Sequence, residues 1–149
     1  MEMLQTIRKT DLARNTSQVI RNVLRGQTAV VESHGQPEVA IVDIIDYQIQ
    51  RAALNYYAQQ PAVSEADDFS DQAFAAIRDD QERYSRVLAL YLAELISLSR
   101  SAEVLKLPTF DLRLRFVRLG IPLRLGPKTV EELEEDVRNA EIWANQTNP

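Results

Sequence analysis

The chain has 149 residues, which suits either one domain or two small units of about 60 to 80 residues each. With 45% hydrophobic and 26% charged residues, the composition indicates a globular protein with a packed core and excludes a disordered or fibrous chain. The absence of cysteine excludes a disulfide framework, a thiolate metal site and a cysteine nucleophile. The longest apolar run, residues 87–93, is far shorter than the roughly 20 residues of a membrane span, so we expect a cytoplasmic protein with no membrane partner.

Charge is distributed unevenly along the chain, whose net charge is -5. Residues 100–128 carry seven basic and two acidic side chains, a local charge of +5, whereas residues 129–149 carry six acidic side chains and one basic, a local charge of -5. Residues 1–42 are close to neutral, at +1. An acidic tail therefore masks a basic segment, and the acidic total does not exclude nucleic acid as a partner.

The first predicted elements are a short edge strand over residues 3–8 and one helix over residues 10–25. Thr10 is a suitable N-cap, and Gly26 stands after the helix, where a left-handed residue is common. Apolar positions at helical spacing predict the buried face of this helix: Leu12, Val19, Ile20, Val23 and Leu24.

Two strands and a second helix are predicted next. Residues 28–32 and 39–44 are rich in β-branched side chains, and the six residues between 32 and 39 suit a hairpin connection. Asp43 is positioned to cap a helix, with Asp46 three residues later. The side chains available for packing on this helix are Tyr47, Ala53, Leu54 and Tyr57. Residues 1–58 are therefore predicted to form a β-α-β-β-α unit.

The second half of the chain is predicted to be mainly helical and to follow a linker. Residues 59–71 combine Pro61 with serines and acidic residues, a composition typical of linkers. No glycine occurs between Gly35 and Gly120, and the pattern predicts helices over residues 86–96, 99–105 and 109–119, with a tight turn at 106–108. The last two helices have the spacing of a helix-turn-helix. The fold class is thus predicted as α+β, with residues 72–149 as the helical part.

Residues 6–57 contain a pattern of residues, at characteristic spacings, that favours a helix, a strand, a turn and a second strand in this order. The residues that carry it are Thr10, Asp11, Leu12, Asn15, Ser17, Val19, Ile20, Gly26, Ala29, Val30, Val31, Gly35, Gln36, Pro37, Val39, Ala40, Ile41, Val42 and Tyr47. This order and spacing resemble the prevent-host-death (Phd/YefM) antitoxin family. The resemblance implies a symmetric homodimer that binds operator DNA upstream of a toxin-antitoxin operon, while more C-terminal residues wrap and silence a cognate toxin.

Basic residues of the first helix are candidates for operator contacts. A polar stripe recurs there at i, i+4, i+7 and i+11, namely Arg14, Gln18, Arg21 and Arg25. From spacing alone, a solvated helix face explains this stripe equally well. The family resemblance favours phosphate contacts by Arg8, Lys9, Arg14 and Arg21.

A second group of residues, within 78–136, carries another resemblance. Its members are Ile96, Ser97, Leu98, Ser101, Ala102, Glu103, Val104, Leu105, Leu107, Phe110, Gly120, Ile121, Pro122 and the acidic run 131–136. They are similar to a family of small, largely uncharacterised prokaryotic proteins with a helix-turn-helix, which are often toxin partners. The chain is therefore interpreted as two antitoxin-like modules.

The predicted helix 109–119 divides into an apolar and a basic side. Six apolar residues are expected to pack, namely Phe110, Leu112, Leu114, Phe116, Val117 and Leu119. The outer side then carries Arg113, Arg115 and Arg118, and a recognition helix would use such arginines to read guanine edges in the major groove. The alternative is that this helix packs or binds a toxin and reads no DNA.

An acidic amphipathic helix is predicted near the end of the chain. Thr129 and Glu132 have the spacing of a capping box. The residues predicted to bind a toxin are Val130, Leu133, Glu134, Val137, Ile142 and Trp143. A solvated helix packed on its own domain is the alternative that the pattern leaves open.

Catalytic chemistry has little basis in the sequence. The single histidine, His34, lies in a turn, and neither a nucleophile motif nor a glycine-rich phosphate loop is present, so we expect no enzyme, no cofactor and no metal. The sequence therefore predicts an antitoxin that neutralises a toxin and binds operator DNA as an autorepressor. The alternative is an interaction module that binds protein only, which is favoured by Ser33 and His34 where the family commonly has basic residues.

Overall fold

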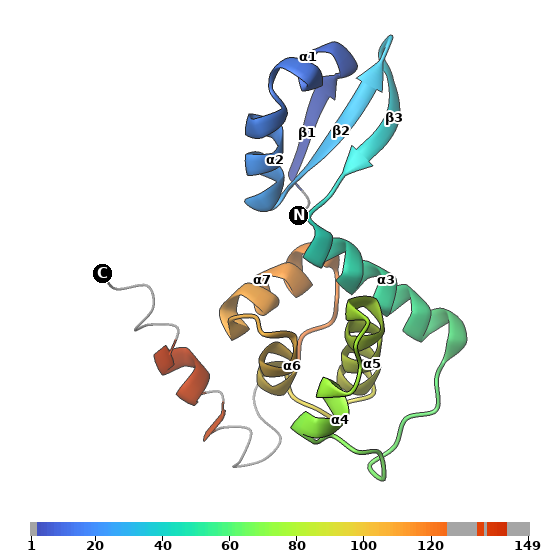
Figure 1. Ribbon diagram of the computed structural model, residues 1–149, viewed down its shortest axis with the longest axis vertical. Helices are drawn as coiled ribbons and strands as arrows, with labels where there is room; N and C mark the ends of the chain where they lie inside the picture. Colours follow the sequence, from blue (N-terminus) through green and yellow to red (C-terminus); the bar gives the residue numbers. More distant parts are fainter. Residues whose placement is uncertain (1–2, 125–133, 136, 143–149) are drawn as a thin grey trace. The chain divides into compact units, whose positions relative to one another are not determined.

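The computed structural model describes residues 3–124, 134–135 and 137–142 (Figure 1). The chain divides into two compact units, Met1–Tyr47 and Gln48–Pro149, which are called the N-terminal and the C-terminal unit below. The first contains a three-stranded mixed sheet with helices, and the second is mainly helical, so the α+β class is confirmed. None of the helices that the structure describes combines the length and hydropathy needed to cross a membrane.

The N-terminal unit contains β1 (Met3–Arg8), α1 (Lys9–Arg14), α2 (Thr16–Leu24), β2 (Gln27–Ser33) and β3 (Gln36–Ile41). The sheet has the order β1-β2-β3, with β1 parallel to β2 and β2 antiparallel to β3 (Figure 1). Parallel neighbours need a crossover connection, and α1 and α2 supply it. The predicted order of a strand, helix, hairpin and helix is confirmed.

The first helix is interrupted, and the prediction of one helix capped by Thr10 is wrong. The helix starts at Lys9, and no side chain caps its N-terminus. Asn15 leaves the helical region at φ -122° and ψ 28°, and the Thr16 hydroxyl donates to the Leu12 carbonyl at 2.8 Å. Side chains of Asn and Thr offer the backbone such local bonds in competition with helix continuation, which explains the break.

The core of the N-terminal unit lies on one face of the sheet. Val19 and Val23 of α2 pack against Ala29 of β2, and the partly buried Ile7, Leu12 and Ile41 complete the cluster. Ile20 and Leu24, which were predicted to share this buried face, are exposed. One position along a helix turns a side chain by about 100°, so the two valines point at the sheet and their neighbours do not.

The opposite face of the sheet is built from the alternate residues. Leu4 pairs with Thr28, Thr6 with Val30, and Val30 with Ala40, so these side chains point away from Ala29 and the α2 valines. Leu4 is 61% exposed, and Val30 is partly buried. Within the described residues of the N-terminal unit, no helix packs on this side, which is called the open sheet face below.

The hairpin between β2 and β3 is tighter than predicted. His34 and Gly35 alone connect the strands, and both have positive φ, 53° and 76°. Two consecutive residues of this kind form the turn that follows the right-handed twist of a hairpin, so the expected six-residue connection is wrong.

Helix α3 (Ile44–Gln59) connects the two units. The Asp43 carboxylate accepts hydrogen bonds from the amides of Ile45 (2.8 Å) and Asp46 (3.1 Å), which confirms Asp43 as its cap. Its buried apolar side chains are Ile49, Ala52 and Ala53, whereas Tyr47, Leu54 and Tyr57, which were expected to pack, are exposed.

The division into units falls inside α3 and not in the predicted linker. The Gln81 side chain of α5 (Asp80–Leu92) donates to the Gln48 carbonyl at 3.0 Å, which ties α3 to the C-terminal unit. Residues 60–70 contain no helix or strand, as their composition predicted, yet Arg86 pairs with Asp67 at 3.5 Å. The segment 59–71 is therefore a loop of the C-terminal unit.

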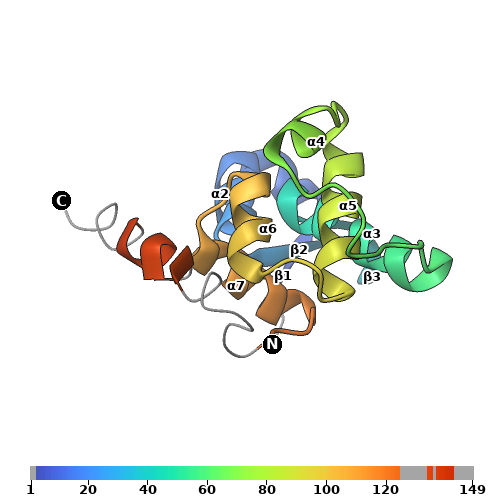
Figure 2. The same cartoon turned by 90° about the horizontal axis from the view of Figure 1, so that it is seen from below.

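The C-terminal unit also contains α4 (Asp71–Ala75), α6 (Leu98–Leu105) and α7 (Thr109–Leu119). Helices α5 and α6 lie side by side, and α7 packs against α6 (Figure 2). Helix α5 begins earlier than predicted because Asp79 caps it by accepting from the Glu82 amide at 2.9 Å. It ends at Leu92, where Glu94 adopts a left-handed φ of 63° in place of the absent glycine.

The core of this unit is centred on α5 and α7. Val87, Leu88 and Leu90 of α5 are fully buried, and the ring of Tyr91 lies 5.1 Å from that of Phe116 on α7. The Tyr91 hydroxyl donates to the Pro122 carbonyl at 2.7 Å, which anchors the segment that follows α7. Burial raises the pKa of the Tyr91 phenol, so this donor stays protonated at neutral pH.

Two leucines of α7 provide a matched test of this packing. Leu112 is fully buried and Leu114 is 48% exposed. We expect Leu112→Ala to lower the free energy of unfolding by about 2–5 kcal/mol, because it removes core contacts and leaves a cavity. Leu114→Ala should cost less than about 1 kcal/mol. Urea unfolding measures both, and equal losses would contradict the observed orientation of α7.

Candidate functional site

Two of the four predicted phosphate contacts in the N-terminal unit form ion pairs within the chain. The Arg8 guanidinium contacts the Asp11 carboxylate at 3.0 Å, and the Lys9 ammonium contacts Glu38 at 2.8 Å. All four groups are substantially exposed to solvent, where such pairs contribute little stability and exchange partners readily. The positive charges of Arg8 and Lys9 are therefore partly neutralised by carboxylate partners within the chain.

The other cations of this unit lie on the outer side of α2 or just before it. Arg14, Arg21 and Arg25 are exposed, and Gln18 accepts a hydrogen bond from Arg21 at 3.3 Å. The Gln18 amide in turn donates to Asn22 at 2.9 Å. Hydrogen bonds thus connect Arg21, Gln18 and Asn22 along α2, while Arg14, Arg21 and Arg25 present their guanidinium groups to solvent.

The C-terminal unit contains the predicted pair of helices joined by a tight turn. The Ser97 hydroxyl caps α6 by accepting from the Arg100 amide at 2.9 Å. Lys106 ends α6 in a left-handed conformation, and the Leu107 amide donates to the Ala102 carbonyl at 2.9 Å. Helix α7 then begins at Thr109 and ends at Leu119, and these bounds are the predicted ones.

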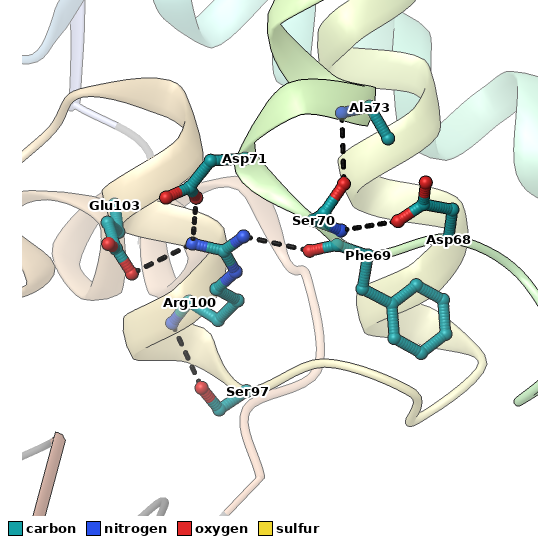
Figure 3. Close-up of polar contacts among 8 residues, drawn as sticks. All are labelled: Asp68, Phe69, Ser70, Asp71, Ala73, Ser97, Arg100 and Glu103. Carbon is teal, nitrogen blue, oxygen red and sulfur yellow. Dashed lines mark hydrogen bonds and ion pairs between the residues drawn. The ribbon is translucent and has the colours of Figure 1, made fainter.

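Arg100 on α6 is the centre of a polar network that holds the loop before α4 (Figure 3). Its guanidinium contacts Asp71 at 2.7 Å and Glu103 at 3.1 Å, and it donates to the Phe69 carbonyl at 2.8 Å. Burial tends to lower the pKa of Arg100, but its hydrogen bonds to Asp71 and Glu103 outweigh this and raise it. The charge of Arg100 is therefore used inside the fold and is not offered to a ligand.

The loop itself is ordered by short side chains next to Arg100. The Ser70 hydroxyl accepts from the Ala73 amide at 3.2 Å and caps α4, while the Ser70 amide donates to Asp68 at 2.9 Å (Figure 3). The hydrogen bond from the Ser70 backbone is the main reason why the pKa of Asp68 is lowered. Within the segment predicted to be a loop or linker, Ser70 thus caps α4 and Asp68 accepts the hydrogen bond of the Ser70 amide.

The arginines predicted on the outer side of α7 have different environments. Arg113 is exposed, and Arg118 is partly exposed. The Arg115 side chain is only 11% exposed and contacts Asp111 at 2.9 Å, so its assignment to the outer face is wrong. Arg115 lies nearer to the buried Leu112 and Phe116 than to Arg113 around the helix, which explains its burial.

The apolar residues of α7 also separate into two groups. Leu112 and Phe116 are fully buried, as predicted. Phe110, Leu114 and Val117, which were predicted to pack as well, are each about half exposed. These three residues recur at i, i+4 and i+7 and form one continuous strip on the surface, which is called the α7 row below.

The acidic tail is described in part. Residues 134–135 and 137–142 are helical, and Glu134, Val137 and Ile142 of the predicted toxin-binding set are exposed on it. Val130, Leu133 and Trp143, which complete that set, lie outside the described residues.

The described residues of the C-terminal unit line at least two pockets. One, of about 310 Å³, is lined by Glu103, the turn residues 106–109, Asn139 and Ile142. The other, of about 400 Å³, is lined by Asp71, Phe74, Ala75, Arg83, Glu103, Val104 and Lys106. Among the residues that the structure describes, no group of His, Asp and Glu side chains is arranged to hold a metal ion.

Sequence reasoning missed the open sheet face, the α7 row and the role of Arg100. The open sheet face could have been recognised from the alternation of side chains along each strand. Val30 follows Ala29 in β2, and Leu4 precedes Gln5, the partner of Ala29, in β1, so Leu4 and Val30 point to the face opposite Ala29. For α7, the spacing places Phe110, Leu114 and Val117 on one side and Leu112, Phe116 and Leu119 on the other, and nothing in the sequence indicates which side is buried. Comparison of the chain with models of protein families, with curated proteins and with solved structures finds no match.

Proposed function

We propose that the protein is a type II antitoxin of the prevent-host-death kind. Its N-terminal unit forms a homodimer and binds operator DNA as an autorepressor, and its acidic C-terminal segment neutralises a toxin. The observation that carries the proposal is the N-terminal element order: a parallel strand pair bridged by two helices, then a hairpin and a helix. Residues 6–57, whose sequence resembles the antitoxin family, make up most of this part of the chain.

The open sheet face supports dimerisation. A unit of fewer than about 60 residues buries only a modest core, and a partner that covers an apolar face adds the missing burial. Leu4, Val30 and Ala40 provide that face here, since they share one side of the sheet and Leu4 is largely exposed. A symmetric pair of such faces would bury Leu4 from both copies.

The polar side of α2 supports DNA binding. Arg14 and Arg21 are exposed arginines on or beside one helix, and phosphate contacts by arginine supply affinity without sequence information. Arg113 on α7 is the exposed member of the predicted C-terminal set, whereas Arg115 is engaged with Asp111. We therefore assign the main operator contacts to the N-terminal unit.

The alternative is an interaction module that binds protein only. It is favoured by the ion pairs of Arg8 with Asp11 and of Lys9 with Glu38, which reduce the cations available to DNA. Both functions use the same open sheet face, so DNA binding distinguishes them.

Dimerisation is tested by a charge on the open sheet face. In sedimentation of the full chain, Leu4→Glu should weaken the dimer by at least about tenfold, because each copy would bury an unpaired carboxylate. The matched control is Val39→Glu, since Val39 is an exposed apolar residue of β3 in register with the covered Val31. A dimer unaffected by Leu4→Glu, or disrupted equally by Val39→Glu, would contradict this interface.

DNA binding is tested with a double-stranded fragment from upstream of the protein's own operon. Arg14→Ala and Arg21→Ala should each lower affinity and reduce the log-log salt slope by about 0.9, the value for one phosphate contact. Arg78→Ala removes an equally exposed charge from a loop of the C-terminal unit and should change neither quantity. If the parent protein does not bind the fragment, the protein-only alternative is correct. If it binds and Arg14→Ala and Arg21→Ala bind equally well at every salt concentration, the operator contacts lie elsewhere and the polar side of α2 is only a solvated face.

Toxin neutralisation is tested in cells that express the product of the adjacent reading frame. Deletion of residues 129–149 should abolish rescue while dimerisation and DNA binding persist, because the deletion removes the exposed Val137 and Ile142 and the acidic side chains that steer a basic partner. A shorter deletion of residues 145–149 is the control. Full rescue by the protein without residues 129–149 would show that the toxin-binding site lies in another part of the chain.

A further inference from the structure

A chain of hydrogen-bonded side chains, called the α2 network below, leads from the sheet to the outer surface of α2. The Asn22 side-chain nitrogen donates to the Gln5 carbonyl oxygen at 3.3 Å. Gln5 lies on the sheet face that α2 covers, because it pairs with Ala29. The Asn22 side-chain oxygen accepts from Gln18 at 2.9 Å, and the Gln18 oxygen accepts from the Arg21 guanidinium at 3.3 Å.

The α2 network fixes which way the Gln18 amide is turned. A guanidinium group can only donate, so the Gln18 atom that faces Arg21 is the oxygen, and the Gln18 nitrogen faces Asn22. Asn22 is turned by the same rule, since its oxygen accepts from Gln18 and its nitrogen donates to Gln5. Both Asn22 and Gln5 are partly buried. The amide of Gln18 is therefore oriented from within the fold before any ligand binds.

Gln18 keeps one donor and one acceptor for a ligand. A glutamine side chain has two N–H groups and two oxygen lone pairs, and the α2 network uses one of each. In the major groove of DNA, one glutamine N–H and one lone pair bind adenine at N7 and at the N6 amino group. Gln18 is exposed, so its amide is accessible to such a base.

The surroundings of Gln18 suit a helix that lies in the major groove. With about 100° between successive residues, Arg21 points directly away from the buried Val19 and Val23. Gln18 lies next to Arg21 on the same outer side of α2. Residues 12–31 contain three arginines and no carboxylate, so nothing in this part of the chain repels phosphates.

From these observations we infer that Gln18 reads one adenine in the major groove of the operator, while Arg14 and Arg21 contact phosphates. The inference rests on the proposed function and adds to it a source of sequence specificity, because phosphate contacts position a protein and base contacts specify the site. Asn22 and Gln5 are positioning residues, which hold the Gln18 amide and so reduce the conformational freedom that it loses on binding.

Variants of the α2 network test the inference. In the full chain, Gln18→Ala should weaken binding to the fragment upstream of the operon at least about fivefold, the effect of one paired base contact. Its affinity for random-sequence DNA and its salt slope should stay unchanged, because no phosphate contact is lost. Asn22→Ala should cause a smaller loss of the same kind. The control is Gln72→Ala, which removes an exposed glutamine from α4 and should change none of these quantities.

Modified DNA tests the base itself. Footprinting of the parent protein defines the bound region, and each adenine in it is then replaced by 7-deazaadenine, which has C–H in place of the N7 acceptor. At one adenine in each half-site, the replacement should weaken binding of the parent at least about twofold, because one of the two bonds to the base is lost. The same replacement should leave binding of Gln18→Ala unchanged.

The outcomes separate this inference from the proposed function. If the parent prefers the upstream fragment to random DNA and Gln18→Ala keeps the same preference, Gln18 reads no base and operator binding stands. Equal weakening of the parent and of Gln18→Ala by every 7-deazaadenine would overturn the inference in the same way. A parent protein without any preference for the fragment would overturn both the operator binding and the role of Gln18.

Discussion

Incomplete burial of apolar side chains, seen among the described residues of both units, is the constraint that explains most of what their surfaces offer. The N-terminal unit has two short helices for a three-stranded sheet, so α2 packs on Ala29 and the face with Leu4 and Val30 stays open. In the C-terminal unit, Leu112 and Phe116 of α7 are buried in the core, whereas the residues of the α7 row are about half exposed. Small units bury a lower fraction of their surface, and they satisfy the remainder through partners.

The arginines divide into those that contact carboxylates within the fold and those that remain exposed. Arg100 and Arg115 contact carboxylates within the fold, where their positive charge organises the α4 loop and the first turns of α7. Arg14, Arg21 and Arg113 remain exposed. The cations available to a polyanion are therefore a smaller set than the composition suggests. In the proposed function, exposed arginines of the N-terminal unit contact the phosphates of operator DNA.

The order and the kind of the elements could be read from local signals. Asp43 as a helix cap, the hairpin between β2 and β3, and the bounds of α7 all depend on residues within a few positions of one another. Errors arose where a side chain competes with its own backbone, as Thr16 does with the Leu12 carbonyl, or where a left-handed position lacks glycine, as at Glu94. In each case the local signal was present in the sequence, but the apolar periodicity of the surrounding helix favoured a longer helix.

What the sequence by itself determined is therefore the α+β class, the succession of elements and the opposite charges of residues 100–128 and 129–149, because composition, capping and periodicity are local properties. Tertiary structure alone decided which of two apolar faces is buried. On α7, Leu112 and Leu114 are chemically identical and two positions apart, and only the packing of α7 against α6, together with the contact of Phe116 with Tyr91 of α5, selects the side of Leu112 and Phe116 as core. The packing of α2 on one face of the sheet makes the same selection between Ala29 and Val30, because alternate residues of a strand point to opposite faces.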